Sequence, residues 1–186
     1  HSAFKILINY FDKNIGFGGS KKNAYLYAIK KNYDYVICLH GDGQYPPEKL
    51  ETMYNYLSIN NYEMVQGSRV NYLNGGMPIY KIISNKFLNF IEESIFKFKF
   101  LEYHSGFRGY SCSALKKIPL ENLSDSHLIT AEILAMAKIR KFKVKDFPID
   151  TIYNANSSSM KFLPALKYGI NVFYVLINCL LSKYNL

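Results

Sequence analysis

The chain has 186 residues, a length that fits one domain able to bury a hydrophobic core. Hydrophobic residues make up 49% of it and charged residues 20%, a composition that excludes an intrinsically disordered protein. The net charge of +9 favours contact with phosphate groups, but the lysines are scattered and form no basic arm, so we expect no nucleic-acid partner.

The first part of the chain predicts a strand, a helix and a second strand. The apolar run 4–8 is expected to be a strand, followed by a loop at the glycine cluster 16–19. Ser20 is the expected cap of a helix whose apolar residues recur at helical spacing until Asn32 breaks it. Residues 35–39 form an apolar run typical of a buried strand. These elements predict a βαβ unit.

Strand and helix signals continue to alternate through the rest of the chain. Further helices are expected over residues 47–57, 79–98 and 124–139, and further strands over 64–65, 107–112 and 144–149. This alternation predicts an α/β fold in which a sheet lies between helices.

The C-terminal residues 154–186 are expected to form a helical segment apart from the domain over residues 1–153. Residues 162–181 are long enough to span a bilayer but include several polar side chains. On a helical wheel the polar residues form one narrow stripe, made of Lys167, Asn171, Tyr174, Asn178 and Ser182. Three interpretations are open: a membrane-interface helix, packing against the domain or a second subunit, and a spanning helix.

The cysteines bear on the compartment. Cys38, Cys112 and Cys179 are far apart and lack the spacing of zinc ligands, so we expect neither a disulfide framework nor a zinc site. This favours a reducing, cytoplasmic compartment. The sequence begins at His1 rather than Met, and we therefore expect that an N-terminal portion is missing from it.

The sharpest chemical signal follows the strand expected over 35–39. In parallel α/β sheets the ligand crevice lies at the carboxyl ends of the strands, which is where Asp42 and Gln44 stand. A carboxylate and an amide oxygen two residues apart can face one Mg²⁺ or Mn²⁺ ion. By spacing alone, an ordinary Asp-Gly turn is the more common interpretation.

The residues around this pair extend the pattern. The stretch 14–19 reads NIGFGG, and the stretch 40–48 reads HGDGQYPPE. Later matches follow in order at Gly67-Ser68-Arg69, Gly75-Gly76, Asn85 and Ser105-Gly106-Phe107-Arg108. Together these motifs, over roughly residues 14–153, resemble glycosyltransferase family 2, especially its polyprenyl- or dolichyl-phosphate sugar synthase branch. The resemblance implies a GT-A fold with a mainly parallel sheet. It also implies inverting, metal-dependent transfer from a UDP- or GDP-sugar donor to a lipid-phosphate or glycan acceptor.

The resemblance also implies roles for single residues. Asp42 would anchor the catalytic cation. Arg69, Lys81 and Arg108 are candidates for holding donor or acceptor phosphates, with a solvated surface charge as the alternative for each. Glu132 stands near an acidic position that serves in the family as base toward a hydroxyl acceptor, with a helix-surface glutamate as the alternative. A lipid-phosphate acceptor is already an anion and needs no base.

Two departures from the family pattern matter. His40 occupies the first acidic position of the metal loop, where it is a substitute ligand, a hydrogen-bond partner of the nucleotide or a plain strand-end residue. The family's first strand, with its proline and acidic signature, is not recognisable before Phe4, which implies that the first nucleotide-binding elements are missing. A further histidine, His104, either lines the acceptor site or packs beside it.

We therefore expect a glycosyltransferase at the cytosolic face of a membrane. Two other functions stay open: a degenerate sugar-nucleotide-binding module, favoured by His40 and the short N-terminus, and a sugar-nucleotide nucleotidyltransferase. The sequence does not specify the sugar, the nucleotide, the acceptor or the oligomeric state.

Overall fold

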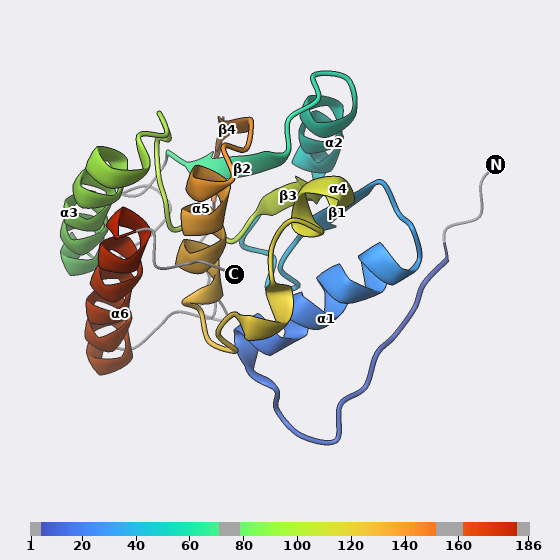
Figure 1. The fold of residues 1–186 in the computed structure, drawn as a ribbon, viewed down its shortest axis with the longest axis horizontal. Coiled ribbons are helices and arrows are strands. Elements are labelled where there is room, and N and C mark those ends of the chain that lie inside the picture. The colour runs from blue at the N-terminus through green and yellow to red at the C-terminus, as the bar shows by residue number, and fades with distance from the viewer. Residues whose placement is uncertain (1–4, 71–78, 152–161, 182–186) are drawn as a thin grey trace.

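The computed structural model describes residues 5–70, 79–151 and 162–181. The helices in this part of the chain are α1 (Gly16–Lys30), α2 (Leu50–Ser58), α3 (Ile79–Phe96), α4 (Cys112–Leu115), α5 (Ile129–Ile139) and α6 (Phe162–Leu180). The strands are β1 (Tyr35–Cys38), β2 (Met64–Arg69), β3 (Arg108–Ser111) and β4 (Val144–Ile149). Short 3-10 turns lie at Pro47–Lys49 and Leu120–Asn122. The expected α/β class is confirmed, with helices around a central sheet (Figure 1).

The four strands form one mixed sheet in the order β1-β3-β2-β4. Strands β2 and β4 are parallel, with Met64 opposite Val144. Strand β3 lies antiparallel between β1 and β2, so that β1, β2 and β4 all run in one direction. The expected parallel arrangement therefore holds for three strands, and β3 is the reversed one.

Side chains alternate between the two faces of this sheet, as strand geometry requires. On β2, Met64 points into the larger hydrophobic cluster and Val65 into the smaller one. Helix α2 covers the smaller cluster with Met53 and Leu57. Helix α2 can approach β3 closely because Gly109 has no side chain. A Cβ atom at that position would lie only 2.8 Å from the Met53 sulfur.

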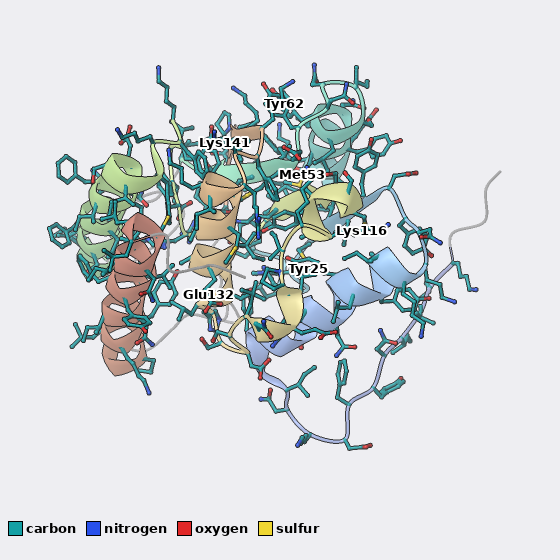
Figure 2. The ribbon with its side chains drawn as sticks, viewed as in Figure 1. Tyr25, Met53, Tyr62, Lys116, Glu132 and Lys141 are labelled. Carbon is teal, nitrogen blue, oxygen red and sulfur yellow. The ribbon has the colours of Figure 1, made fainter. Side chains whose placement is uncertain are left out.

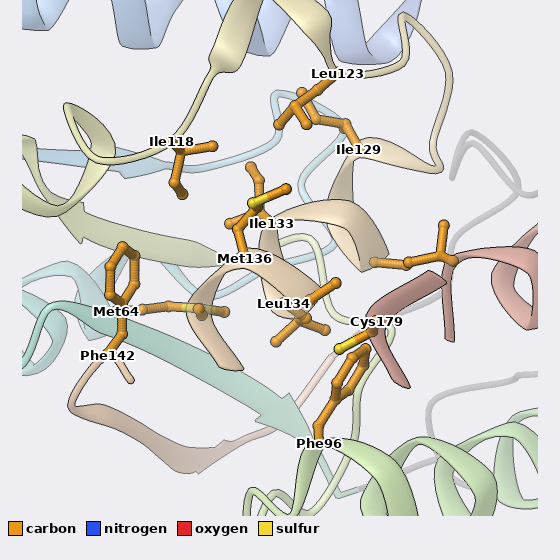
Figure 3. Close-up of a cluster of buried hydrophobic side chains, with 14 of the residues drawn as sticks. Met64, Phe96, Ile118, Leu123, Ile129, Ile133, Leu134, Met136, Phe142 and Cys179 are labelled. Atoms are coloured by element: carbon orange, nitrogen blue, oxygen red, sulfur yellow. The ribbon is translucent and has the colours of Figure 1, made fainter. Parts of the chain in front are cut away.

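The larger cluster lies on the other face and joins α1, α3, α5 and α6 to the sheet. Figure 3 shows Met64 of β2 and Ile133 and Met136 of α5 inside it, with Phe96 of α3 and Cys179 of α6 nearby. Full burial of such a side chain contributes roughly 1.5 to 3 kcal/mol. This cluster therefore fixes the position of α5, the helix that carries Glu132.

The strand expected at the N-terminus is absent from the described residues 5–15, so the predicted βαβ unit is wrong at its first element. Ile6 is 84% exposed and Ile8 is 64% exposed. A strand needs partners for its backbone amide and carbonyl groups, and no neighbouring strand pairs with this segment in the described part of the chain.

The glycine cluster is the first turn of α1, rather than the predicted loop before a helix capped by Ser20. The side chain of Asn14 accepts a hydrogen bond from the Gly16 amide at 2.8 Å. The Gly18 amide donates to the carbonyl oxygen of Asp125 at 2.7 Å. A Cβ atom on Gly18 would lie 2.2 Å from the carbonyl oxygen of Ser124, so only glycine allows this contact.

The remaining predicted elements are confirmed, each within a few residues of its observed bounds. The helix expected over 79–98 is α3, and the one expected over 124–139 begins later, at Ile129. The longest strands, β2 and β4, include the predicted ranges 64–65 and 144–149.

Helix α6 packs against the domain through one face and leaves another face open. Its buried residues, which belong to the larger cluster, are Val172, Val175, Leu176 and Cys179. Its exposed apolar residues are Leu166, Ile170, Phe173, Ile177 and Leu180. Neither α6 nor another helix in the described ranges combines the length and apolar character needed to cross a membrane. Packing against the domain, one of the three interpretations of this segment, therefore accounts for the inner face of α6 and not for its exposed outer face.

Candidate active site

The sheet topology brings three polar segments to one edge. Strands β1 and β2 end there, and β3 begins there because it runs the opposite way. The register places Arg108 opposite both Cys38 and Gln66. The loop after β1, the end of β2 and the segment before β3 therefore meet, and they carry most of the residues predicted to form the site.

The loop after β1 holds Asp42 and Gln44 in a tight turn. One carboxylate oxygen of Asp42, Oδ1, accepts a hydrogen bond from the Gln44 amide at 3.1 Å. Gly43 between them has φ of +69°, a conformation that favours glycine. The next residue, Tyr45, anchors the loop because its hydroxyl accepts a hydrogen bond from the Gly106 amide at 2.9 Å.

This loop fits a divalent cation only if other ligands join it. The described part of the chain contains no group of three or more His, Cys, Asp or Glu side chains that could hold a metal. Mg²⁺ is commonly bound by one or two carboxylates together with substrate phosphates and waters. Asp42 and Gln44 would fit such a shared site if substrate phosphates supplied the remaining oxygens, and metal binding by this loop stays a prediction.

His40 is enclosed by aromatic rings and backbone. Its ring centroid lies 5.5 Å from that of Phe17 and 5.2 Å from that of Tyr45, edge-on in both cases. A Cβ atom on Gly106 would lie 2.2 Å from the His40 ring. The buried Nε2 atom has no hydrogen-bond partner among the described residues. Burial first, and the charge of Lys21 second, lower the pKa of His40 to about 4, so its ring is neutral near pH 7.

Lys21 also faces this edge, although no sequence motif singled it out. It projects from α1, is 8% exposed, and places its ammonium 4.5 Å from the centre of the Phe17 ring. Its Nζ atom donates a hydrogen bond to the Gly106 carbonyl oxygen at 3.4 Å. Burial lowers the pKa of Lys21 to about 8. Among the described residues no carboxylate forms an ion pair with it.

Arg69, at the end of β2, is paired with the buried Glu102. A Glu102 oxygen accepts hydrogen bonds from the Arg69 backbone amide at 3.1 Å and from Nε at 2.8 Å. The guanidinium Nη2 atom also contacts Glu102 and the carbonyl oxygen of His104. Glu102 therefore fixes the direction of the guanidinium. Phosphate binding by Arg69 stays a prediction, and Glu102 is a site residue that the sequence analysis missed.

Arg108 is fully buried at the start of β3. Its Nε, Nη1 and Nη2 atoms donate to the Gln66 side chain at 2.7 Å, the Thr130 carbonyl at 2.8 Å and the Tyr103 carbonyl at 2.6 Å. These bonds favour a structural role over the predicted phosphate contact. Lys81 lies within α3, but its side chain is outside what the structure describes.

Glu132 lies in the first turn of α5, at the end of that helix near α1 (Figure 2). Its Oε2 atom accepts a hydrogen bond from the Ser124 amide at 2.8 Å. Lys22 of α1 holds the same loop, through an ion pair with Asp125 at 2.7 Å and a hydrogen bond to the Leu123 carbonyl. Burial raises the pKa of Glu132, which suits a base, and the Ser124 contact opposes that rise. The base role stays a prediction.

His104, in the segment before β3, contacts helices α3 and α6. Its Nε2 atom lies 3.0 Å from a carboxylate oxygen of Glu92 on α3, and Nδ1 lies 3.3 Å from the hydroxyl of Tyr168 on α6. Both ring nitrogens therefore face protein groups, which favours the packing interpretation of His104 over the acceptor-lining one. Glu92 and Tyr168 lie outside every motif and were not predicted.

Comparison with known proteins supplies the family. The model of Glycosyl transferase family 2 matches residues 3–119. An uncharacterized protein of Methanocaldococcus jannaschii is 32% identical over 148 residues, which cover 78% of this chain and 61% of that protein. The UDP-N-acetylglucosamine--dolichyl-phosphate N-acetylglucosaminyltransferase of Methanococcus voltae is 26% identical over 181 residues, 96% of this chain and 71% of that protein. The chain thus spans less than two thirds of the first relative. No solved structure matches it significantly.

Proposed function

This chain belongs to glycosyl transferase family 2, and we propose that it carries out inverting transfer of a sugar from a UDP- or GDP-sugar to a lipid phosphate or a glycan. The family has the GT-A fold, and the α/β sheet between helices agrees with it. The observation that carries the proposal is the loop after β1. It holds Asp42 and Gln44 together at the carboxyl end of the strand.

The proposed reaction needs few protein groups. Positive charge develops on the sugar as its bond to the diphosphate breaks, and negative charge develops on the departing phosphate. Asp42 and Gln44 would hold Mg²⁺ or Mn²⁺, which supplies positive charge at that phosphate when bound. Arg69, held by Glu102 at the end of β2, would contact a donor or acceptor phosphate.

A lipid phosphate is the acceptor we favour. The Methanococcus voltae relative is named for transfer to dolichyl phosphate. A phosphate oxygen is already anionic and attacks the sugar without a general base. This agrees with the contact of Glu132 to the Ser124 amide, which gives that carboxylate a structural task. A glycan hydroxyl would instead require Glu132, or another group, to accept its proton.

The outer faces of α3 and α6 support a membrane location. These two helices lie at the same end of the molecule (Figure 1). Helix α3 exposes Ile83, Phe87 and Phe90, and α6 exposes Ile170 and Phe173. An exposed apolar surface of this kind needs a partner, and the net charge of +9 favours anionic lipid headgroups. We therefore place the protein peripherally at the cytosolic face of a membrane, where a lipid acceptor is confined.

Vesicle binding tests this location. The triple change Phe87→Ser, Phe90→Ser and Phe173→Ser is expected to lower the fraction that sediments with anionic vesicles by about tenfold or more, because each aromatic side chain gains roughly 1.5 to 3 kcal/mol on full burial. The folded domain should survive, since these residues are exposed. The control is Ile59→Ser at the C-terminal end of α2, a residue that is 70% exposed. Helix α2 lies on the other side of the molecule from α3 and α6 (Figure 1). Equal sedimentation of the triple variant and wild type would contradict the membrane surface.

Release of UDP or GDP from a panel of nucleotide sugars tests the catalytic proposal. We expect release with one donor in the presence of Mn²⁺ and none after EDTA. The second candidate, a non-catalytic sugar-nucleotide-binding module, is favoured by His40 at the first acidic position of the loop. That candidate predicts donor binding without release. The family match favours both candidates over nucleotidyl transfer.

A further inference from the structure

The surroundings of Lys21 are basic and lack a counter-charge. Helix α1 carries this side chain into the sheet edge, where it is buried beside His40 and the Phe17 ring. The cationic side chain of Arg108 also acts on Lys21, and no carboxylate among the described residues forms an ion pair with it. A buried ammonium without an anionic partner is unfavourable and is uncommon in proteins.

The neighbouring histidines add to this arrangement. The ring of His127, in the loop before α5, stacks on Phe17 with centroids 4.2 Å apart. The charge of Lys21 contributes to lowering the pKa of both His40 and His127. His40 keeps a buried Nε2 atom with no hydrogen-bond partner among the described residues. An ammonium, an imidazole nitrogen and a second imidazole thus converge at the edge that carries Asp42.

A purely structural role explains this geometry poorly. The aliphatic stem of lysine can cover apolar surface, but its charged end normally reaches water. Here the ammonium makes one hydrogen bond to the protein, to the Gly106 carbonyl at 3.4 Å, although it has three donors. Methionine would fill the same space without the cost of burying a charge.

We propose that Lys21, with His40 and His127, forms an anion cradle that binds the diphosphate of the nucleotide-sugar donor. The assignment rests on the proposed function, since that function defines the ligand. A diphosphate would supply the counter-charge that Lys21 lacks and an acceptor for its remaining donors. It would also accept a hydrogen bond from His40 in the tautomer that carries the proton on Nε2.

The cradle has a defined part in the transfer. The anomeric carbon of the sugar loses its bond to the diphosphate oxygen, which keeps the electron pair, and forms a bond to the acceptor oxygen. With a lipid-phosphate acceptor no proton is released, and with a hydroxyl acceptor one proton leaves that oxygen. Lys21 stabilises the charge left on the diphosphate, which is the group whose charge grows in the transition state.

Calorimetric titration with inorganic pyrophosphate in EDTA tests the cradle without a nucleotide or a metal. We expect wild type to bind pyrophosphate and Lys21→Met to bind it at least about tenfold more weakly, because one close charge pair is lost. Lys30→Met is the matched control, since it removes the same charge from the exposed end of the same helix. Equal affinity of Lys21→Met and wild type, or no binding by wild type, would overturn the proposal.

Thermal unfolding of Lys21→Met provides the fold control. The pKa of Lys21 lies near 8 in the folded protein, below the ordinary value of 10.5. The cost of burying its charge is therefore fully present below pH 8 and is relieved as the pH rises toward 10.5. Lys21→Met should melt above wild type at pH 7, with a smaller gain at high pH. A lower Tm at pH 7 would contradict the unpaired charge on which the cradle depends.

A second measurement uses the wild-type chain alone. Pyrophosphate is expected to reduce acetylation of Lys21 by acetic anhydride, measured by mass spectrometry, and to leave Lys30 unchanged. Unchanged acetylation of Lys21 would count against the cradle. If pyrophosphate binding requires Lys21 but no nucleotide sugar is turned over, the anion site stands and the proposed transferase activity fails.

Discussion

Replacing Asp42 with Asn is expected to abolish Mn²⁺-dependent sugar transfer while the domain stays folded. Asn is nearly isosteric, and its side-chain oxygen can still accept the hydrogen bond from the Gln44 amide that closes the loop. The change removes the carboxylate of the predicted metal pair, and neutral oxygens alone hold a divalent cation weakly. Initial rates of transfer at several Mn²⁺ concentrations, with melting temperatures alongside, measure this effect.

The control for Asp42→Asn is Asp12→Asn, the same chemical change at an exposed position before α1. It should transfer sugar at the wild-type rate. Near wild-type turnover of Asp42→Asn at saturating Mn²⁺ would refute the role of Asp42. It would show that the enzyme does not need this carboxylate to hold the metal.

Replacing Glu132 with Gln is expected to separate the two acceptor classes. If the acceptor is a hydroxyl, the rate should fall by about 100- to 10,000-fold, the usual contribution of a general base. If it is a lipid phosphate, as we favour, the loss should be small. Gln can keep the hydrogen bond from the Ser124 amide, so the loop before α5 should remain in place.

Glu121→Gln, at an exposed position, is the matched control for Glu132→Gln. Rates with polyprenyl phosphate and with a glycan acceptor should be compared for both variants. A large loss with polyprenyl phosphate in a variant that melts like wild type would contradict the base-free mechanism. A lowered melting temperature would instead assign Glu132 to holding the loop.

Local patterns were enough to predict the elements on either side of the loop after β1. Three local features can be interpreted from neighbouring residues alone. They are the apolar run over 35–39, the proline at position 47 and the polar residues between them. They predicted β1, the loop and the turn into α2 correctly. The family motifs added the GT-A fold, which spacing alone did not contain.

Features set by distant parts of the chain were not predictable in this way. The glycines at 16–19 look like a loop, and they form a helical turn because Gly18 meets the backbone of Ser124 and Asp125. The run 4–8 has strand composition, but a strand requires a partner that hydropathy does not reveal. The reversed direction of β3 likewise depends on how the chain returns to the sheet.

The same reasoning applies to single site residues. Arg69 was found through its motif, but its partner Glu102 lies 33 positions away in a segment without one. In the sequence Lys21 is one of many scattered lysines, and only the structure shows that it is buried beside His40. Arg108 was predicted as a candidate phosphate ligand, whereas its three guanidinium nitrogens each donate a hydrogen bond to a protein oxygen. Burial and hydrogen-bond partners, which the sequence does not reveal, are the observations that favour one role over another for these residues.

Transfer of a labelled sugar to lipid tests the central claim most directly. The protein would be incubated with Mn²⁺, vesicles containing polyprenyl phosphate and each of a panel of labelled UDP- and GDP-sugars, followed by organic extraction. We predict that one donor delivers its label to the organic phase, that the product has the anomeric configuration opposite to the donor, and that EDTA prevents the transfer. Label that stays on the nucleotide with every donor, in a protein that binds those donors, would contradict the account.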